Sequence, residues 1–288
     1  MDTGAGGPAM TAHPELTWRL GAEDDLADIT VSAAGNAAVT PEWAWQGATG
    51  RGVRVCVVDS GVDRDHPLLA PVRATHAVVT GPGGKAVVRE SDAADTCGHG
   101  TACAGIIRSI APECELHSVQ VLGAGFSGTG DAFVTGLRWA IEQGFDVVSL
   151  SLSTNRRHLA EPLRELGDLA YFRRTVLVAS AHNLPVESFP WRFSSVISVG
   201  SHAGADPGLI LYNPRPPVEF FAHGSDVEVA WPGGGRTRCT GNSFATPHVA
   251  AHCALILSKH PGLTPFQVKT VLYLTAQNVR RPIDDGER

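Results

Sequence analysis

The chain has 288 residues, with 23 Lys and Arg against 29 Asp and Glu, which gives a formal net charge of −6 at pH 7. This mild acidity argues against a nucleic-acid partner, because nucleic acids are bound by basic surfaces. Hydrophobic residues make up 43% and charged residues 18%, a composition typical of globular proteins and far from that of disordered chains. No run of 18 apolar residues occurs, so we expect no membrane-spanning helix and no membrane partner.

The first 40 residues differ from the rest in composition and in hydrophobic pattern. They are rich in Gly, Ala, Asp and Glu and lack a sustained apolar period, so we expect residues 1–40 to form an N-terminal extension, partly disordered, ahead of one domain at 41–288. Residues 2–25 contain neither a basic nor an apolar segment, and we expect no secretory signal there. The six cysteines are therefore predicted to be mostly free thiols in a cytoplasmic protein.

From Arg51 onward, short β-branched runs alternate with helical patterns. Strands are predicted at 53–58, 115–122, 145–152, 175–179 and 196–199. Helical spacing of apolar residues falls between them, and two more helices are predicted, at 243–258 and from Thr264-Pro265. This alternation predicts an α/β fold: a doubly wound, mostly parallel sheet with helices on both faces.

Three polar residues stand in glycine-bounded settings along this pattern. Asp59 directly follows the first predicted strand, His99 lies between glycines in CGHGTACAG, and Ser243 opens a helix in GNSFATPHVA. Taken singly, each has an ordinary explanation: a turn Asp, a surface His and a helix-capping Ser. Together, at the carboxyl edge of one sheet, they supply an orienting carboxylate, a general base and a nucleophile.

These motifs resemble those of the subtilisin-like serine proteases, the subtilases. VVDSGVDRDHP resembles the family's Asp motif, HGTACAG its His motif and GNSFATPHVA its Ser motif, and the likeness extends from about residue 44 to about residue 275. The resemblance implies the family's doubly wound fold and serine endopeptidase activity through an acyl-enzyme, without a cofactor. It implies the triad Asp59, His99 and Ser243, and VASAHN at 178–183 implies that Asn183 donates to the oxyanion.

The resemblance also implies a peptide or protein substrate held as an extended strand. The segments that match the family's substrate-binding positions are Gly125, Phe126, Ser127 and Gly128 on one side, and Ser151, Leu152, Ser153, Ala179, Ser180 and Ala181 on the other.

The sequence departs from the family pattern at several positions. Leu68 stands where the secreted enzymes have a calcium-binding Asp, and the segment after HGTACAG is short, so we expect that calcium site to be absent and no other metal to be bound. Asn242 replaces a Thr next to the nucleophile, and His182 replaces a Gly before Asn183. Trp191 falls where a small residue lines the specificity pocket, so it either narrows that pocket or has moved to the surface with a shortened loop.

Cys97 and Cys103 bracket His99, and Cys239 lies four residues before Ser243. A metal site formed with His99 would remove the general base, so we interpret them as thiols that make the enzyme sensitive to mercurials.

Two function classes compete for this sequence. The first is an active intracellular serine endopeptidase, in a general form or as a dedicated protease that removes the leader from one peptide in a natural-product pathway. The second is a catalytically inactive peptide-binding module on the same fold. Because all four catalytic positions are filled, the sequence favours the enzyme.

Overall fold

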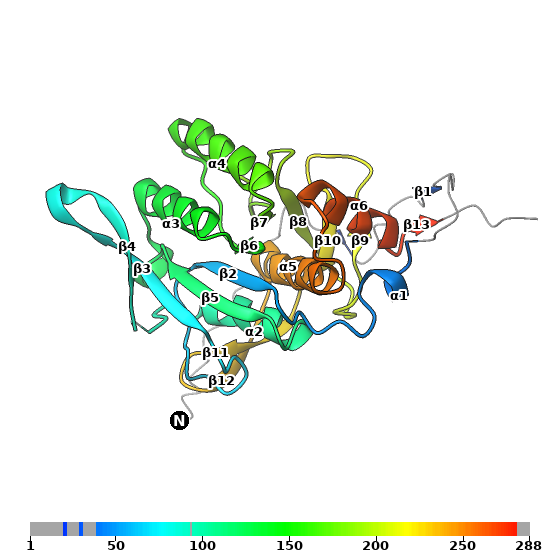
Figure 1. The fold of residues 1–288 in the computed structure, drawn as a ribbon, viewed down its shortest axis with the longest axis horizontal. Coiled ribbons are helices and arrows are strands. Elements are labelled where there is room, and N and C mark those ends of the chain that lie inside the picture. The colour runs from blue at the N-terminus through cyan, green and yellow to red at the C-terminus, as the bar shows by residue number, and fades with distance from the viewer. Residues whose placement is uncertain (1–19, 22–28, 31–38, 93, 281–288) are drawn as a thin grey trace, which may run out of the picture.

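A nine-stranded, mostly parallel sheet forms the centre of the computed structural model, which describes residues 20–21, 29–30, 39–92 and 94–280 (Figure 1). Neighbouring strands are parallel except for the antiparallel pairs at the two edges, β4 with β3 and β9 with β10. In spatial order the strands are β4 (Ala86–Glu90), β3 (Ala74–Thr80), β5 (Glu115–Gln120), β2 (Arg54–Asp59), β6 (Val147–Leu150), β7 (Val176–Ser180), β8 (Ile197–His202), β10 (Phe220–His223) and β9 (Leu211–Tyr212). The predicted α/β class is confirmed.

Helices cover both faces of this sheet, as the doubly wound prediction requires. On one face lie α3 (Gly130–Glu142) and α4 (Ala160–Phe172), and on the other lie α2 (His99–Ile110), α5 (Asn242–Lys259) and α6 (Pro265–Thr275) (Figure 1). Successive residues of a strand point to opposite faces. In β2, accordingly, Val55 and Val57 join the core under α2 and α5, whereas Cys56 and Val58 join the core under α3.

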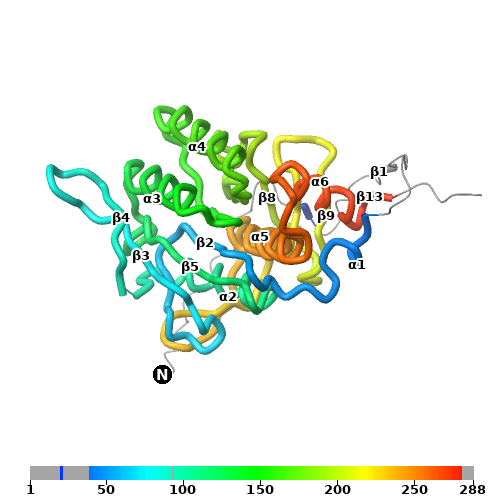
Figure 2. The backbone as a smooth tube through the Cα atoms, in the orientation of Figure 1, coloured from blue at the N-terminus to red at the C-terminus, as the bar shows by residue number. Residues whose placement is uncertain are grey.

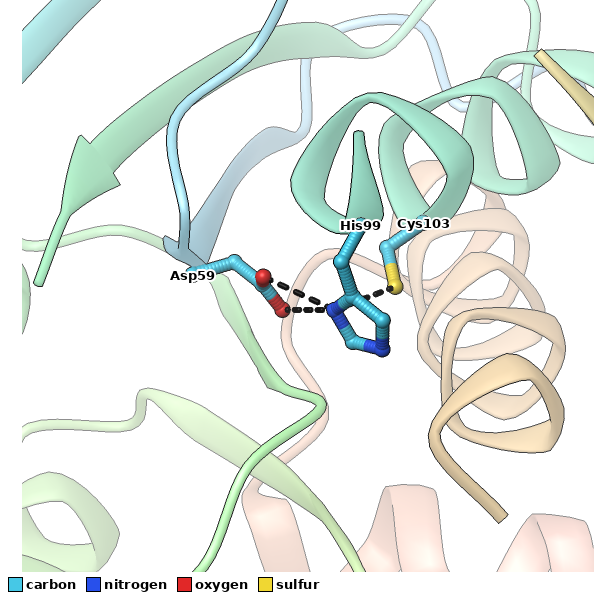
Figure 3. Close-up of side chains that lie close together, drawn as sticks. All are labelled: Asp59, His99 and Cys103. Atoms are coloured by element: carbon cyan, nitrogen blue, oxygen red, sulfur yellow. Dashed lines mark hydrogen bonds and ion pairs between the residues drawn. The ribbon is translucent and has the colours of Figure 1, made fainter. Parts of the chain in front are cut away.

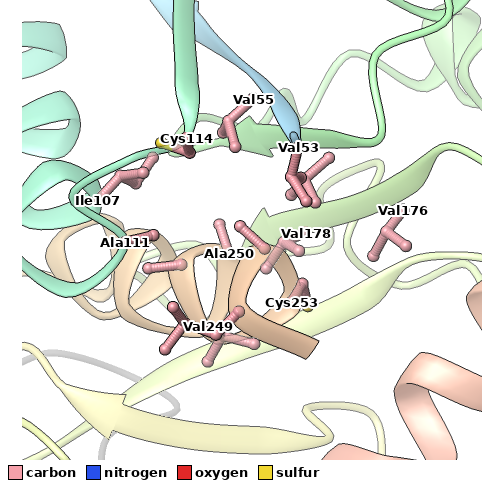
Figure 4. Close-up of a cluster of buried hydrophobic side chains, with 14 of the residues drawn as sticks. Val53, Val55, Ile107, Ala111, Cys114, Val176, Val178, Val249, Ala250 and Cys253 are labelled. Atoms are coloured by element: carbon pink, nitrogen blue, oxygen red, sulfur yellow. The ribbon is translucent and has the colours of Figure 1, made fainter. Parts of the chain in front are cut away.

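The core around α5 is built from small and β-branched side chains. Val249, Ala250 and Cys253 on α5 are fully buried, and they pack against Val55 of β2 and Val178 of β7 (Figure 4). Small residues let a helix approach a sheet closely, which brings the first turn of α5 to the carboxyl edge of the central strands. The helix begins one residue before the predicted start and ends one after the predicted end.

The helix predicted from Thr264-Pro265 is also confirmed. Thr264 and Gln267 form a capping box at the start of α6. The remaining helical elements are the four-residue α1 (Pro41–Ala44) and three 3-10 turns, at Pro82–Gly84, Ala124–Phe126 and Arg157–Leu159. No helix in the described ranges has both the length and the apolar character that a bilayer crossing requires.

Two hairpins were not predicted. The β3–β4 hairpin projects from the body of the molecule, as Figure 2 shows, and a second hairpin pairs β11 (Val227–Trp231) with β12 (Gly235–Cys239) next to α2. Their sequences lack a long apolar run, and β12 alternates glycine, arginine and threonine.

Two short pieces of the predicted N-terminal extension lie among the described residues. The Leu20 amide donates to the Ser201 carbonyl at 2.8 Å, and β1 (Ile29–Thr30) pairs in parallel with β13 (Val279–Arg280). The rest of that extension lies outside the described residues, so its predicted boundary at residue 40 stays a prediction.

A buried arginine fixes α2 to the loops beside it. Arg108 is 8% exposed and donates to four backbone carbonyls: Leu69 at 3.1 Å, Pro71 at 2.6 Å, Pro112 at 2.7 Å and Cys114 at 2.9 Å. The guanidinium therefore acts as an internal cation that joins the loop after Leu68 to the end of α2.

Candidate active site

The structure brings Asp59 and His99 into direct contact. Asp59 is the last residue of β2 and is fully buried, and His99 is the first residue of α2. His99 Nδ1 lies 2.8 Å from Asp59 Oδ1 and 3.0 Å from Oδ2 (Figure 3). Because a carboxylate can only accept, Nδ1 carries the proton and Nε2 of a neutral ring presents a lone pair, as a general base requires.

Glycines allow this approach. A Cβ added at Gly100 would lie 2.0 Å from the Gly61 carbonyl oxygen and 3.3 Å from Asp59 Cβ, so no side chain fits there. Gly98 has φ +82, which favours glycine, and faces the Trp231 ring. The glycines on either side of His99 therefore permit close backbone approach around it.

The surroundings of His99 favour its protonated form. Burial by itself would lower the pKa of His99, but the charge of Asp59 and its hydrogen bonds outweigh burial and raise that pKa well above its ordinary value. Cys103 Sγ lies 3.9 Å from His99 Nδ1 (Figure 3), and burial raises the pKa of this thiol, which keeps it neutral at physiological pH.

Ser243 lies in the first turn of α5, where backbone amides point out of the helix and its dipole favours negative charge. Its carbonyl accepts hydrogen bonds from Ser151 Oγ at 2.8 Å and from Cys103 Sγ at 3.6 Å. Ser243 thus lies beside the residues that contact His99. Its hydroxyl makes no hydrogen bond with any described residue, in keeping with nucleophile–base contacts that tighten only when substrate binds.

Asn183 follows β7, and its side chain is oriented by α5. Asn183 Oδ1 accepts the Asn242 amide at 3.1 Å, so the Nδ2 donor points away from the helix backbone. Asn242 is itself fully buried: its Oδ1 accepts from the Ser201 amide at 3.0 Å and its Nδ2 donates to the His182 carbonyl at 3.3 Å. The Asn242 side chain therefore ties β7 to β8 rather than facing the cavity, a positioning role that the sequence analysis did not foresee.

A cavity of about 600 Å³ opens over these residues, and His99, Ser243 and Asn183 all line it. Of the predicted substrate-binding residues, seven line it as well: Phe126, Gly128, Ser151, Leu152, Ser153, Ser180 and Ala181. Gly125 and Ser127 lie in the same loop without lining the cavity. Ala179 is a correction, because it is fully buried in the core under α3 and α4, on the opposite face of β7 from its neighbours.

Trp191 matches neither interpretation left open by the sequence. It is 2% exposed, packs in the core under α3 and α4, and donates from Nε1 to Ser188 Oγ at 2.8 Å. It does not line the cavity.

The charged lining of the cavity is cationic. Arg156, which sequence reasoning missed, lines it, and no Asp or Glu among the described residues does. Arg156 makes no ion pair in the described part of the chain, whereas the next residue, Arg157, pairs with Glu187 at 3.4 Å.

Among the described residues, one group places three potential metal-ligating atoms within 4.8 Å of one another: Asp59, His99 and Cys103. Cys97, which the sequence placed on the other side of His99, donates instead to the Gly123 carbonyl at 2.9 Å. A metal ion bound to this group would displace the contact between His99 Nδ1 and Asp59. The three residues therefore do not fit a permanently bound metal ion if His99 is to act as a base.

Comparison with known proteins agrees with this geometry. The model of the subtilase family matches residues 50–287. Subtilisin DY of Bacillus licheniformis is 33% identical over 249 residues, covering 81% of this chain and 87% of that protein. The subtilisin of Bacillus pumilus is 34% identical over 247 residues, covering 80% and 86%.

Solved structures extend the likeness to the fold. A cold adapted subtilisin-like serine proteinase matches with a TM-score of 0.61 and 25% identity, over 85% of this chain and 87% of that one. A lanthipeptide protease matches with a TM-score of 0.65 and 24% identity, over 78% and 80%, which shows a shared fold. The Asp59–His99 contact, the cavity above it and these relatives lead to one conclusion: this chain belongs to the subtilase family and is a serine endopeptidase.

Proposed function

We propose that Asp59, His99 and Ser243 form the catalytic triad and that Asn183 completes the oxyanion hole. His99 Nε2 takes the proton of the Ser243 hydroxyl as Oγ attacks the scissile carbonyl, and Asp59 holds the ring in the required tautomer and stabilises the imidazolium. The bond from His99 Nδ1 to Asp59 at 2.8 Å, made beneath the cavity that Ser243 lines, carries this proposal.

The negative charge that develops on the carbonyl oxygen is met by two donors in this mechanism. The first is the Ser243 amide in the first turn of α5, and the second is Asn183 Nδ2, whose direction is set by the bond between Asn183 Oδ1 and the Asn242 amide. Proton return from His99 to the leaving amine yields the acyl-enzyme, which water then hydrolyses by the same steps in reverse.

A fluorophosphonate probe tests the nucleophile directly. The parent protein is expected to be labelled and to cleave peptides, whereas Ser243→Ala is expected to do neither. Ser258→Ala is the matched control, because Ser258 lies near the opposite end of the same helix, where its hydroxyl donates to the Leu255 carbonyl. Peptide cleavage by Ser243→Ala at the parent rate would refute Ser243 as the nucleophile. A parent protein that neither labels nor cleaves would refute the triad and favour the inactive peptide-binding module.

We also propose that the enzyme works in a reducing compartment, the cytoplasm. All six cysteines lie in the described residues and none is in a disulfide, and four of them are buried, a use of cysteine that suits such a compartment. Fractionation of source cells, with the protein followed by antibody, is expected to place it inside the cell. Recovery from the culture medium alone would overturn this assignment.

A narrower candidate is a protease dedicated to one peptide, from which it removes a leader. The feature that favours it is the cavity, where Arg156 supplies a permanent positive charge and no Asp or Glu among the described residues lines the wall. The likeness to the lanthipeptide protease is a likeness of fold and is no argument about substrate. A lack of casein digestion combined with cleavage of a small set of peptides would support a dedicated enzyme, and broad casein digestion would contradict it.

A further inference from the structure

The charge of the cavity points to a substrate class, on the basis of the proposed function. We infer that Arg156 selects peptides that carry Asp or Glu directly before the cleaved bond. Arg156 is exposed at the cavity wall, and the neighbouring arginines Arg157 and Arg192 are already paired with Glu187.

The position of Arg156 follows from the segment that carries it. This segment begins at Ser151, whose hydroxyl bonds to the Ser243 carbonyl, and continues along the cavity wall to Arg156. Thr154 holds it in place through paired backbone hydrogen bonds with Phe189, both at 2.9 Å. Arg156 and Ser243 line the same cavity, so a substrate side chain that enters between this wall and the one formed by Ala181 and Asn183 can reach Arg156.

The partners of the neighbouring arginines explain why Arg156 is available. Glu187 accepts ion pairs from both Arg157 and Arg192, each at 3.4 Å. On the β12 side of the cavity, Arg238 is paired with Asp226. Arg156 has no such partner among the described residues, and its only hydrogen bonds use its backbone.

A carboxylate in the substrate would supply the missing partner. The planar guanidinium of arginine can donate two parallel hydrogen bonds to a carboxylate. A Gln or Asn side chain in the substrate has nearly the same shape as Glu or Asp but lacks the negative charge. Because Arg156 is exposed, we expect a modest preference, about fivefold in kcat/KM for Glu over Gln. Salt is expected to weaken it.

The experiment compares quenched peptides that are identical except for Glu or Gln before the cleaved bond. The wild-type enzyme is expected to prefer Glu at low ionic strength, and Arg156→Gln to reduce the ratio to about one. The charge-reversing Arg156→Glu should instead favour Lys at that position. Arg157→Gln is the matched control, since Arg157 adjoins Arg156 but does not line the cavity, and it is expected to keep the wild-type ratio.

A ratio of one in the wild-type enzyme, or a ratio that Arg156→Gln leaves unchanged, would overturn the inference. A binding arm keeps it separate from the proposed mechanism: the Ser243→Ala protein is titrated with the uncleaved Glu and Gln peptides, and their dissociation constants are compared by fluorescence anisotropy. If no variant turns over substrate, the proposed triad fails. The inference about Arg156 would still be supported if the Ser243→Ala protein binds the Glu peptide more tightly than the Gln peptide and Arg156→Gln removes that difference. Equal affinities would refute it.

Discussion

The carbonyl cage around Arg108 predicts a large loss of stability on substitution. Arg108→Met keeps most of the side-chain stem but removes all four hydrogen bonds. The bonds to Leu69 and Cys114 are buried, so those two carbonyls would be left without a partner, at about 1 to 3 kcal/mol each. Water can reach the partly buried carbonyls of Pro71 and Pro112. We therefore expect a destabilisation of about 3 to 5 kcal/mol.

Urea denaturation monitored by circular dichroism measures this loss. The Ser243→Ala background prevents self-digestion. Arg138→Met is the matched control because Arg138 is exposed on α3 and its side chain makes no hydrogen bond or ion pair among the described residues. The control is expected to change stability by less than about 0.5 kcal/mol. A chelator is expected to leave the parent unfolding curve unchanged, since Arg108 already supplies a cation at these loops. A loss below about 1 kcal/mol for Arg108→Met, or a marked loss in the parent on adding chelator, would refute this reasoning.

Three further predictions concern the site. Asn183→Ala is expected to lower kcat by about 10² to 10³ with little change in KM, the range known for loss of this donor in subtilisin; an unchanged kcat on a quenched peptide would remove Asn183 from the oxyanion hole. Because Asp59 raises the pKa of His99 above 6.5 and only the neutral ring is a base, kcat/KM is expected to rise with pH through a midpoint above 6.5. The stability that the Asp59–His99 pair contributes is present in full below pH 6.5 and is lost as pH rises through that midpoint. Asp59→Asn should move the midpoint down and slow turnover by about 10⁴, and a midpoint that stays in place would contradict the role of Asp59. An organomercurial is expected to inactivate the enzyme through Cys239, which lines the cavity, or Cys103, which contacts His99; full activity after exhaustive treatment, or equal inactivation of the Cys103→Ala, Cys239→Ser double variant, would show that these thiols are not responsible.

The sequence was sufficient to predict the central strands and the three motifs because each combines local signals. β2 ends at Asp59, directly after a β-branched run, and α5 is an unbroken helix of small residues. These features depend on neighbours along the chain, so they need no knowledge of tertiary contacts. The contact between His99 and Asp59 then follows once both motifs lie at one edge of a parallel sheet.

The features that the sequence did not predict depend on distant partners. Trp191 is buried because it packs in the core under α3 and α4, which no local pattern encodes. The role of Asn242 depends on Ser201, 41 residues away, and the β3–β4 hairpin has a glycine-rich turn but lacks the long apolar run of a buried strand. Arg156 reads in sequence as one of two adjacent surface arginines, and the cavity distinguishes it from Arg157.

The contact between Gly100 and Gly61 has a consequence for anyone who redesigns this enzyme. The segment from Ser151 to Arg156 lines an open cavity and can accept varied side chains, so new specificities can be sought there by saturation mutagenesis. Gly100 cannot be varied in the same way, since even a methyl group would meet the Gly61 carbonyl and push the start of α2 away from β2. A mutant library for this enzyme should therefore hold Gly100 constant, because the absence of its side chain sets the spacing between the acid and the base, and should keep Gly61 as well, because its φ of +96 favours glycine.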